Sequence, residues 1–135
     1  MVESLSEDQL MWQPHPAATS IAFNVWHLAR WADHVQSRLP QSTIVLGQRL
    51  EARPEVWHAE NLAALWGFDS AYLGDVEAGN ELGVSAAQIH FPSHALLLAY
   101  LRQCYTLEEQ AFTAIDADDW QAFGTPESHQ MWCDD

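Results

Sequence analysis

The stretch Ser20-Ile-Ala-Phe-Asn-Val-Trp-His-Leu-Ala-Arg-Trp-Ala-Asp-His34 decides the fold class, because two rows of residues run through it at helical spacing. Thr19 or Ser20 is suited to cap this helix, and Pro40 is expected to close it near residue 38. One row has the spacing of a buried seam: Ile21, Val25, Leu28, Ala32, Val35 and Leu39. The other lies on its flank and is a candidate ligand pocket: Asn24, His27, Trp31 and His34.

A second long amphipathic helix is predicted after Pro92, with Ser93 as its cap, and it continues to Ile115. Its apolar side chains form one stripe over about six turns. The stripe consists of Leu97, Tyr100, Leu101, Cys104, Leu107, Ala111 and Ile115. Because most of the polar side chains fall on the opposite side, we interpret this segment as a bundle helix.

The other predicted helices are short. Ser6 followed by Gln9 is the capping-box pattern, so a helix of one or two turns is expected there. A further helix is predicted over residues 54–66, with Gly67 suited to end it. Two stretches have too little periodicity for an assignment and are interpreted as connections: 41–53 and 69–83.

Two long helices, short helices and no alternating strand pattern predict an all-α bundle. At 135 residues the chain is expected to form one domain. A four-helix bundle normally has four elements of comparable length, whereas only two are long here. The apolar surface left open would be covered by a second chain, so we expect a homodimer or a higher homo-oligomer.

The net charge of the chain argues against two classes of binding partner. Five arginines and no lysine stand against nineteen carboxylates, which gives a net charge of −14. Such a surface repels nucleic acid and anionic membranes, so neither is expected as a partner. The sequence has no apolar run of about 20 residues and no signal-peptide pattern at its start, so we expect a cytoplasmic protein.

The sequence lacks the motifs of several common kinds of catalytic and binding site. Cys104 and Cys133 are expected to be free thiols, and burial within the second helix should raise the pKa of Cys104. The acidic run at 116–119 lacks the glycine and the glutamate of a calcium loop. The sequence also has no glycine-rich phosphate loop, nucleophile elbow or Cys-x-x-Cys motif.

The block from Ser20 to Asp33 resembles the DinB/YfiT-like superfamily of proposed metalloenzymes, in which this helix commonly reads Ser-Ile-Ala and then His-Leu-Ala-Arg. The resemblance covers roughly residues 3–122 and leaves 123–135 as a tail. Its weaker parts follow in order: Arg53-Pro-Glu-Val-Trp57, Trp66-Gly-Phe68, the Gly83 region, Pro92-Ser-His-Ala-Leu-Leu-Leu-Ala-Tyr-Leu101 and Ala117-Asp-Asp-Trp120.

The resemblance implies an up-down-down-up bundle, often dimeric, in which three histidines of many members bind a divalent metal. Some relatives are thiol-dependent transferases or isomerases that use bacillithiol or mycothiol. Carried over by position, the first ligand falls on His27. The other two usually come from a last helix, which would follow the turn at 116–120, and the family's full first helix is also missing here. We therefore interpret the chain as a DinB-like bundle shortened at both ends.

Other metal donors were weighed beside His27, because one imidazole does not hold zinc or nickel. His129 and Cys133 are four residues apart and would complete a three-ligand zinc site with His27 if the tail were helical; a flexible acidic tail is the alternative. His90 and His94 share this spacing, but the intervening proline disrupts a common face. His34 is two turns from His27, about 10 Å, too far for both to bind one ion, and Asp33 with His34 is interpreted as a solvated helix end.

Three interpretations of function follow. The favoured one is an oligomeric protein without an intact metal site that binds a small apolar molecule beside His27 and Trp31, and hence is not an active metalloenzyme. The second is a zinc- or nickel-dependent thiol transferase or hydrolase-type enzyme, whose site is completed by the tail or by a second subunit. The third is a protein–protein interaction module with its tryptophans at the interface.

Overall fold

The computed structural model describes residues 2–68 and 91–122, and every regular element within these ranges is helical. The predicted connection 69–83, the tail 123–135 and His90 lie outside them. No helix in the described ranges has the length and apolar character needed to cross a bilayer. The elements are the 3-10 helix η1 (Val2–Ser4) and the α-helices α1 (Glu7–Leu10), α2 (Ile21–Ser42), α3 (Ile44–Arg49), α4 (Val56–Ala59), α5 (Leu62–Leu65), α8 (His94–Thr113) and α9 (Ala117–Ala122).

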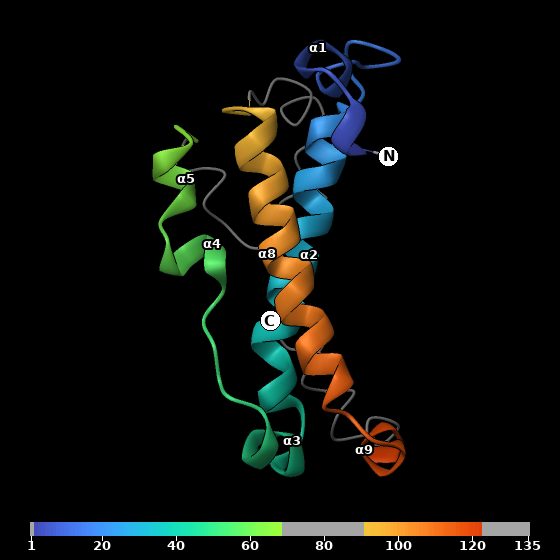
Figure 1. Cartoon of the computed structure of the whole chain (residues 1–135), viewed down its shortest axis with the longest axis vertical. Helices are drawn as coiled ribbons and strands as arrows, with labels where there is room; N and C mark the ends of the chain where they lie inside the picture. Colours follow the sequence, from blue (N-terminus) through green and yellow to red (C-terminus); the bar gives the residue numbers. More distant parts are fainter. Residues whose placement is uncertain (1, 69–90, 123–135) are drawn as a thin grey trace.

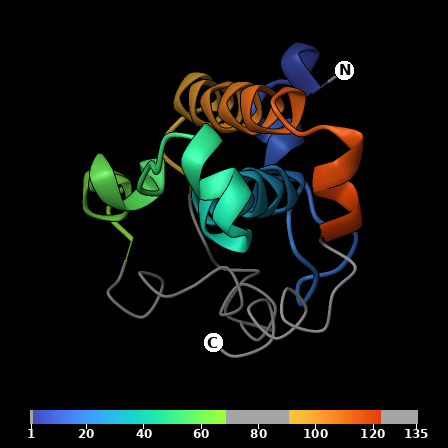
Figure 2. The same ribbon diagram turned by 90° about the horizontal axis from the view of Figure 1, so that it is seen from below.

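The two long helices, α2 and α8, lie side by side and run in the same direction (Figures 1 and 2). Near their starts, Ala22 and Leu97 line one hollow; near their ends, Pro40 and Ala111 line another. The prediction of an all-α fold with two long helices is confirmed. A parallel pair is also what the two middle helices of an up-down-down-up bundle form.

Helix α8 buries the predicted stripe. Ser93 caps it by accepting a hydrogen bond from the Leu96 amide at 3.3 Å. Leu97, Tyr100 and Cys104 are buried, and the remaining four members of the stripe are half-buried. The periodicity of the sequence therefore identified this face correctly.

Helix α2 buries most of the predicted seam, with one exception at Leu28. Leu28, a member of the predicted seam, is 54% exposed, while Ala22 and Ala29 are buried. The small alanine side chains allow α8 to pack closely on their side of α2, which turns Leu28 outward. Val25, Ala32 and Leu39 are buried as predicted, and Ile21 and Val35 are half-buried.

The ends of α2 show one correct and one wrong prediction. Ser20 caps the helix, its hydroxyl accepting from the Phe23 amide at 3.0 Å. Pro40 does not close it, because the helix continues to Ser42. A proline this close to the end costs one backbone hydrogen bond, and its ring is buried. The stretch 41–53, which had no assignment, contains α3.

The predicted helix over 54–66 is two helices, α4 and α5. Asn61 adopts a left-handed conformation with φ 51°, which breaks the helix after one turn. The break folds Trp66 back onto Trp57, with ring centroids 5.4 Å apart. Gly67 follows α5 with φ 73°, the left-handed position for which it was predicted.

The core around α4 and α5 is mainly aromatic. Trp57 also contacts Trp26 of α2 and Tyr100 of α8, with both centroid distances 5.6 Å. Phe68 and Phe91 pack against the same rings. This cluster joins the short helices to the long pair, so burial of aromatic area stabilises their docking.

Candidate functional site

The four residues of the predicted pocket lie along the outward face of α2. Asn24 is at the first turn, where its side-chain amide donates to the Ser20 carbonyl at 2.8 Å and to the Thr19 hydroxyl at 3.2 Å. Trp31 is 37% exposed, and His27 and His34 are half-buried on either side of it. Both imidazoles meet the Trp31 ring edge-on, at centroid distances of 6.3 and 6.1 Å.

His27 uses one ring nitrogen within this row. The Trp31 indole N–H donates to His27 Nε2 at 3.1 Å. A neutral imidazole has one acceptor nitrogen and one N–H, so Nε2 as acceptor places the proton on Nδ1. In this arrangement neither nitrogen of His27 offers a lone pair to a metal ion. The ring is also held by stacking on Phe23 at 5.8 Å.

His34 is joined to the chain that follows α3. Its Nδ1 lies 3.0 Å from Glu55 Oε1, and Glu55 Oε2 lies 2.7 Å from the Arg30 guanidinium. His34 thus extends a buried ion pair to the surface. Its hydrogen bond is to a carboxylate that is already engaged, which favours a positioning role over metal binding.

A buried polar cluster, which sequence reasoning missed, lies beneath the row. Asp33 was interpreted as part of a solvated helix end, yet it is fully buried. Its carboxylate accepts from the Val56 amide at 2.8 Å, the Trp57 amide at 2.9 Å and the Tyr100 hydroxyl at 2.9 Å. The same carboxylate also pairs with Arg30 at 3.3 Å. Asp33 therefore satisfies the free amides at the start of α4.

The charges of this cluster are compensated internally. Burial acts to raise the pKa of Glu55, but the His34 hydrogen bond and the Arg30 charge outweigh it and hold the pKa at about 2. Burial raises the pKa of Tyr100 well above its ordinary value against the charge of Arg30, so its hydroxyl remains a donor. Arg30 also lies over the Trp57 ring at 5.4 Å. The arrangement joins α2, α4 and α8 through buried, mutually compensated charges.

The other predicted groups are structural where they are described. Burial raises the pKa of the Cys104 thiol above its ordinary range, as predicted, so the thiol stays protonated. At the acidic turn before α9, Asp119 pairs with Arg49 of α3 at 2.5 Å, and Asp116 pairs with it at 3.1 Å. These carboxylates bind a guanidinium and join α3 to α9.

With this geometry established, comparison with known proteins identifies the family. A family model described as the DinB superfamily matches residues 1–132. The chain belongs to the DinB superfamily. No curated protein and no solved structure matches it significantly.

A DinB-type metal centre does not fit the residues that the structure describes. No three His, Cys, Asp or Glu side chains come together there in a way that could hold a metal ion. His27, the position of the first family ligand, has its Nε2 lone pair engaged by Trp31. His129 and Cys133, the candidate tail ligands, lie outside the described residues, as does His90.

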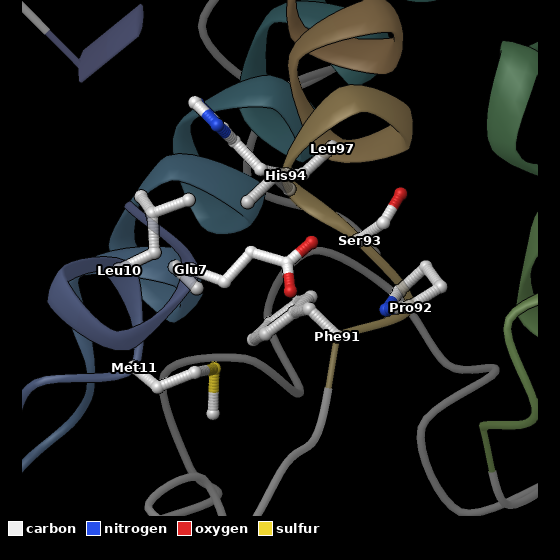
Figure 3. A pocket seen from close by; sticks show the side chains of 9 residues that line it. Glu7, Leu10, Met11, Phe91, Pro92, Ser93, His94 and Leu97 are labelled. Atoms are coloured by element: carbon white, nitrogen blue, oxygen red, sulfur yellow. The ribbon is translucent and has the colours of Figure 1, made fainter. Parts of the chain in front are cut away.

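His94 lies apart from the row, at a hollow of about 90 Å³ between α1 and the start of α8 (Figure 3). Its Nε2 atom is buried and has no hydrogen-bond partner. The wall is mostly apolar, with Glu7 as its charged member. The hollow is large enough for a water molecule to reach His94 Nε2.

A larger and more open hollow, of about 350 Å³, lies beside the first turn of α2. Its lining is mainly apolar and consists of Leu5, Asp8, Gln9, Trp12 and Ile21. Ile21 is two turns before Leu28 on the outward face of α2, so this hollow and the histidine row share one side of the helix.

Proposed function

We propose that this DinB-superfamily chain is a homo-oligomeric protein that binds a small apolar molecule on the outward face of α2 and has no metal-dependent activity. The observation that carries the proposal is the hydrogen bond from the Trp31 indole to His27 Nε2, at 3.1 Å. A metal at His27 would have to displace this bond, while an apolar ligand would not. The row then offers a half-buried aromatic surface.

The exposed side chains of the same face support the binding of an apolar molecule. Leu28 is 54% exposed beside Trp31, and the hollow at Trp12 and Ile21 has a volume of about 350 Å³. Small-molecule sites commonly occupy roughly 300–1,000 Å³ and are mostly apolar, with a few polar groups that orient the ligand. Asn24, His27 and His34 are suited to that orienting role.

Metal analysis tests the first half of the proposal. Protein purified without an affinity tag is expected to contain far less than one zinc or nickel per chain, with no difference between the wild type and His27→Ala. After incubation with excess zinc or nickel and gel filtration, both proteins are expected to remain without stoichiometric metal. Retention of one metal per chain by the wild type, lost in His27→Ala, would overturn the proposal in favour of the metal-dependent enzyme.

Titration with the neutral apolar dye Nile red tests the second half. The wild type is expected to bind the dye saturably, and Trp31→Ala should weaken binding about tenfold, since one buried aromatic contact contributes about 1.4 kcal/mol. Leu65→Ala is the matched control, because Leu65 is an apolar side chain on α5 that is 72% exposed. Absent or unsaturable binding, or equal losses in the two variants, would contradict the proposal.

A further inference from the structure

We propose that the hollow of about 350 Å³ beside the first turn of α2 binds the ammonium group of a small organic cation. This hollow, here called the α1 hollow, is lined by Leu5, Asp8, Gln9, Trp12 and Ile21. The inference rests on the proposed function and deepens it, because it gives the mainly apolar ligand one positive charge and places that charge beside α1.

Local hydrogen bonds hold the walls of the α1 hollow in place. The Ser6 hydroxyl accepts from the Gln9 amide at 3.2 Å, and the Ser6 amide donates to the Gln9 side chain at 2.8 Å, which orders the single turn of α1. The Ile21 amide donates to the Trp12 carbonyl at 3.4 Å and so ties the chain after α1 to the start of α2 (Figure 1). The hollow is therefore built by two segments that are joined at its edge.

The carboxylate of the α1 hollow has no basic partner among residues 2–68 and 91–122. Asp8 is exposed and is the one charged side chain of the lining. The side-chain oxygen of Gln9 is used by the capping box. The chain has no lysine, and four of its five arginines pair with other carboxylates: Arg30, Arg49, Arg53 and Arg102. The charge of Asp8 is therefore open to a cation from outside the chain.

The indole of Trp12 supplies the second group that selects a cation. The side chain of Trp12 is 58% exposed. A cation over the face of an aromatic ring is attracted by the electrons of the ring, and tryptophan attracts it most strongly. An uncharged apolar ligand gains only hydrophobic contact from this ring, whereas an ammonium group is attracted by both the indole and the Asp8 carboxylate. The methyl groups of a quaternary ammonium also bury area against Leu5 and Ile21.

The net charge of the chain and the size of the hollow support the same class of ligand. A charge of −14 attracts cations to the surface and repels anions from it. A phosphate beside the ammonium group, as in a lipid headgroup, would meet this repulsion, so a free organic cation is favoured. The volume of about 350 Å³ lies within the range of roughly 300–1,000 Å³ that is usual for small-molecule sites.

NMR titration with three related compounds at constant ionic strength measures the preference for a cation. Choline carries a trimethylammonium group, and its neutral isostere has a tert-butyl group in that place. Choline is expected to bind about fivefold more tightly than the neutral isostere, because only choline is attracted by the indole and the carboxylate. Phosphocholine should bind more weakly than choline. Equal binding of choline and the neutral isostere, or tighter binding of phosphocholine, would overturn the inference.

The indole N–H signals of isotope-labelled protein locate the site. Among the signals of the seven tryptophans, the one missing from Trp12→Ala is expected to shift most when choline is added. Asp8→Asn should weaken choline binding about threefold and leave the neutral isostere unaffected. Asp118→Asn removes the same charge at an exposed position of α9 and should change neither. Equal losses in the two aspartate variants would show that the overall charge, and not the α1 hollow, attracts choline.

Two measurements separate the failure of this inference from the failure of the proposed function. Circular dichroism checks that Trp12→Ala and the two aspartate variants keep the fold, and Asp8→Asn tests the site without removal of an aromatic side chain. If Nile red binds as expected and choline shows no preference over its isostere, the cation site is wrong while the proposed binding of an apolar molecule stands. If neither compound binds, both are overturned.

Discussion

Asp33 is the residue on which the packing of the long helices and α4 depends. Its Oδ1 accepts from the Val56 amide and the Gln36 side chain, and its Oδ2 accepts from the Trp57 amide and the Tyr100 hydroxyl. Because both oxygens receive a backbone amide, no neutral isostere reproduces the set. One side chain on α2 thus holds both the start of α4 and the middle of α8.

Asp33→Asn is expected to lower the free energy of unfolding by about 3 kcal/mol. Whichever oxygen becomes an NH₂ group, that group faces a backbone N–H donor, and the Arg30 guanidinium loses part of its charge compensation. Urea unfolding followed by circular dichroism measures the change. Asp8→Asn, at an exposed position of α1, is the control and should change stability by less than about 0.5 kcal/mol. Equal effects at the two positions would contradict the role given to Asp33.

The lowered pKa of Glu55 predicts how the stability of the folded protein changes at acid pH. Its pKa is about 2 in the folded protein and 4.5 as the reference value, lowered by the His34 hydrogen bond and the Arg30 charge against the effect of burial. A lowered folded pKa gives stability that is present above about pH 4.5 and is lost as the pH falls toward 2.

We therefore expect the wild type to exceed Glu55→Gln in stability by up to about 3 kcal/mol at pH 6, with the difference shrinking between pH 4.5 and 2. Unfolding curves of both proteins at several pH values measure it. Glu109→Gln, at an exposed position on α8, should show no such pH-dependent difference. A constant gap between the wild type and Glu55→Gln would rule out the proposed linkage.

At the scale of elements, the two long helices show what the sequence could and could not predict. The α8 stripe was predicted correctly because its apolar residues repeat along one side of the whole helix, where α2, Trp57 and Trp66 cover them. On α2 the apolar residues occur on two sides, at Val25 and at Leu28, and the pattern alone does not say which side α8 will cover. Helix α8 packs on the side of Ala22 and Ala29, whose small side chains allow the two helices to approach closely. In the sequence these alanines give no strong hydrophobic signal.

The close contact between α3 and the end of α2 leaves little room for a side chain at Gly47. A Cβ atom at Gly47 would lie 2.9 Å from the Pro40 carbonyl oxygen. Replacing glycine by alanine inside a helix normally stabilises by about 1 kcal/mol. Here the backbone of α3 must shift, so Gly47→Ala is expected to destabilise by about 1–2 kcal/mol.

Thermal unfolding of Gly47→Ala measures this effect, and Gln48→Ala, at the next and exposed position, provides the control for helix propensity. Gln48→Ala is expected to be neutral or slightly stabilising. An increase in melting temperature for Gly47→Ala would show that α3 moves away from Pro40 at little cost.

At the scale of the whole molecule, the candidate site was predictable where it depends on one helix. His27 and Trp31 are four residues apart, so their contact follows from helical geometry. The partner of His34 did not follow, because Glu55 reaches it from a segment 21 residues further along the chain. Asp33 was interpreted as solvated for the same reason, since its partners are the amides of Val56 and Trp57.

The net charge of −14 predicts how salt changes the stability and the self-association of the protein. Exposed carboxylates repel one another within a chain and between copies, and salt screens this repulsion over a Debye length that falls from roughly 30 Å at 0.01 M to 3 Å at 1 M. Raising NaCl from about 20 to 500 mM is therefore expected to increase the free energy of unfolding by about 1 kcal/mol and to tighten self-association.

Thermal unfolding and sedimentation at both salt concentrations measure the two effects. A variant that neutralises three exposed acids, Asp8→Asn with Glu109→Gln and Asp118→Asn, should respond less to salt than the wild type because it has less repulsion to screen. The surface ion pairs of Arg49 and Arg102 act in the opposite direction, since salt weakens them. If stability falls as NaCl rises, these attractive pairs outweigh the net repulsion, and the expected effect of the net charge is contradicted.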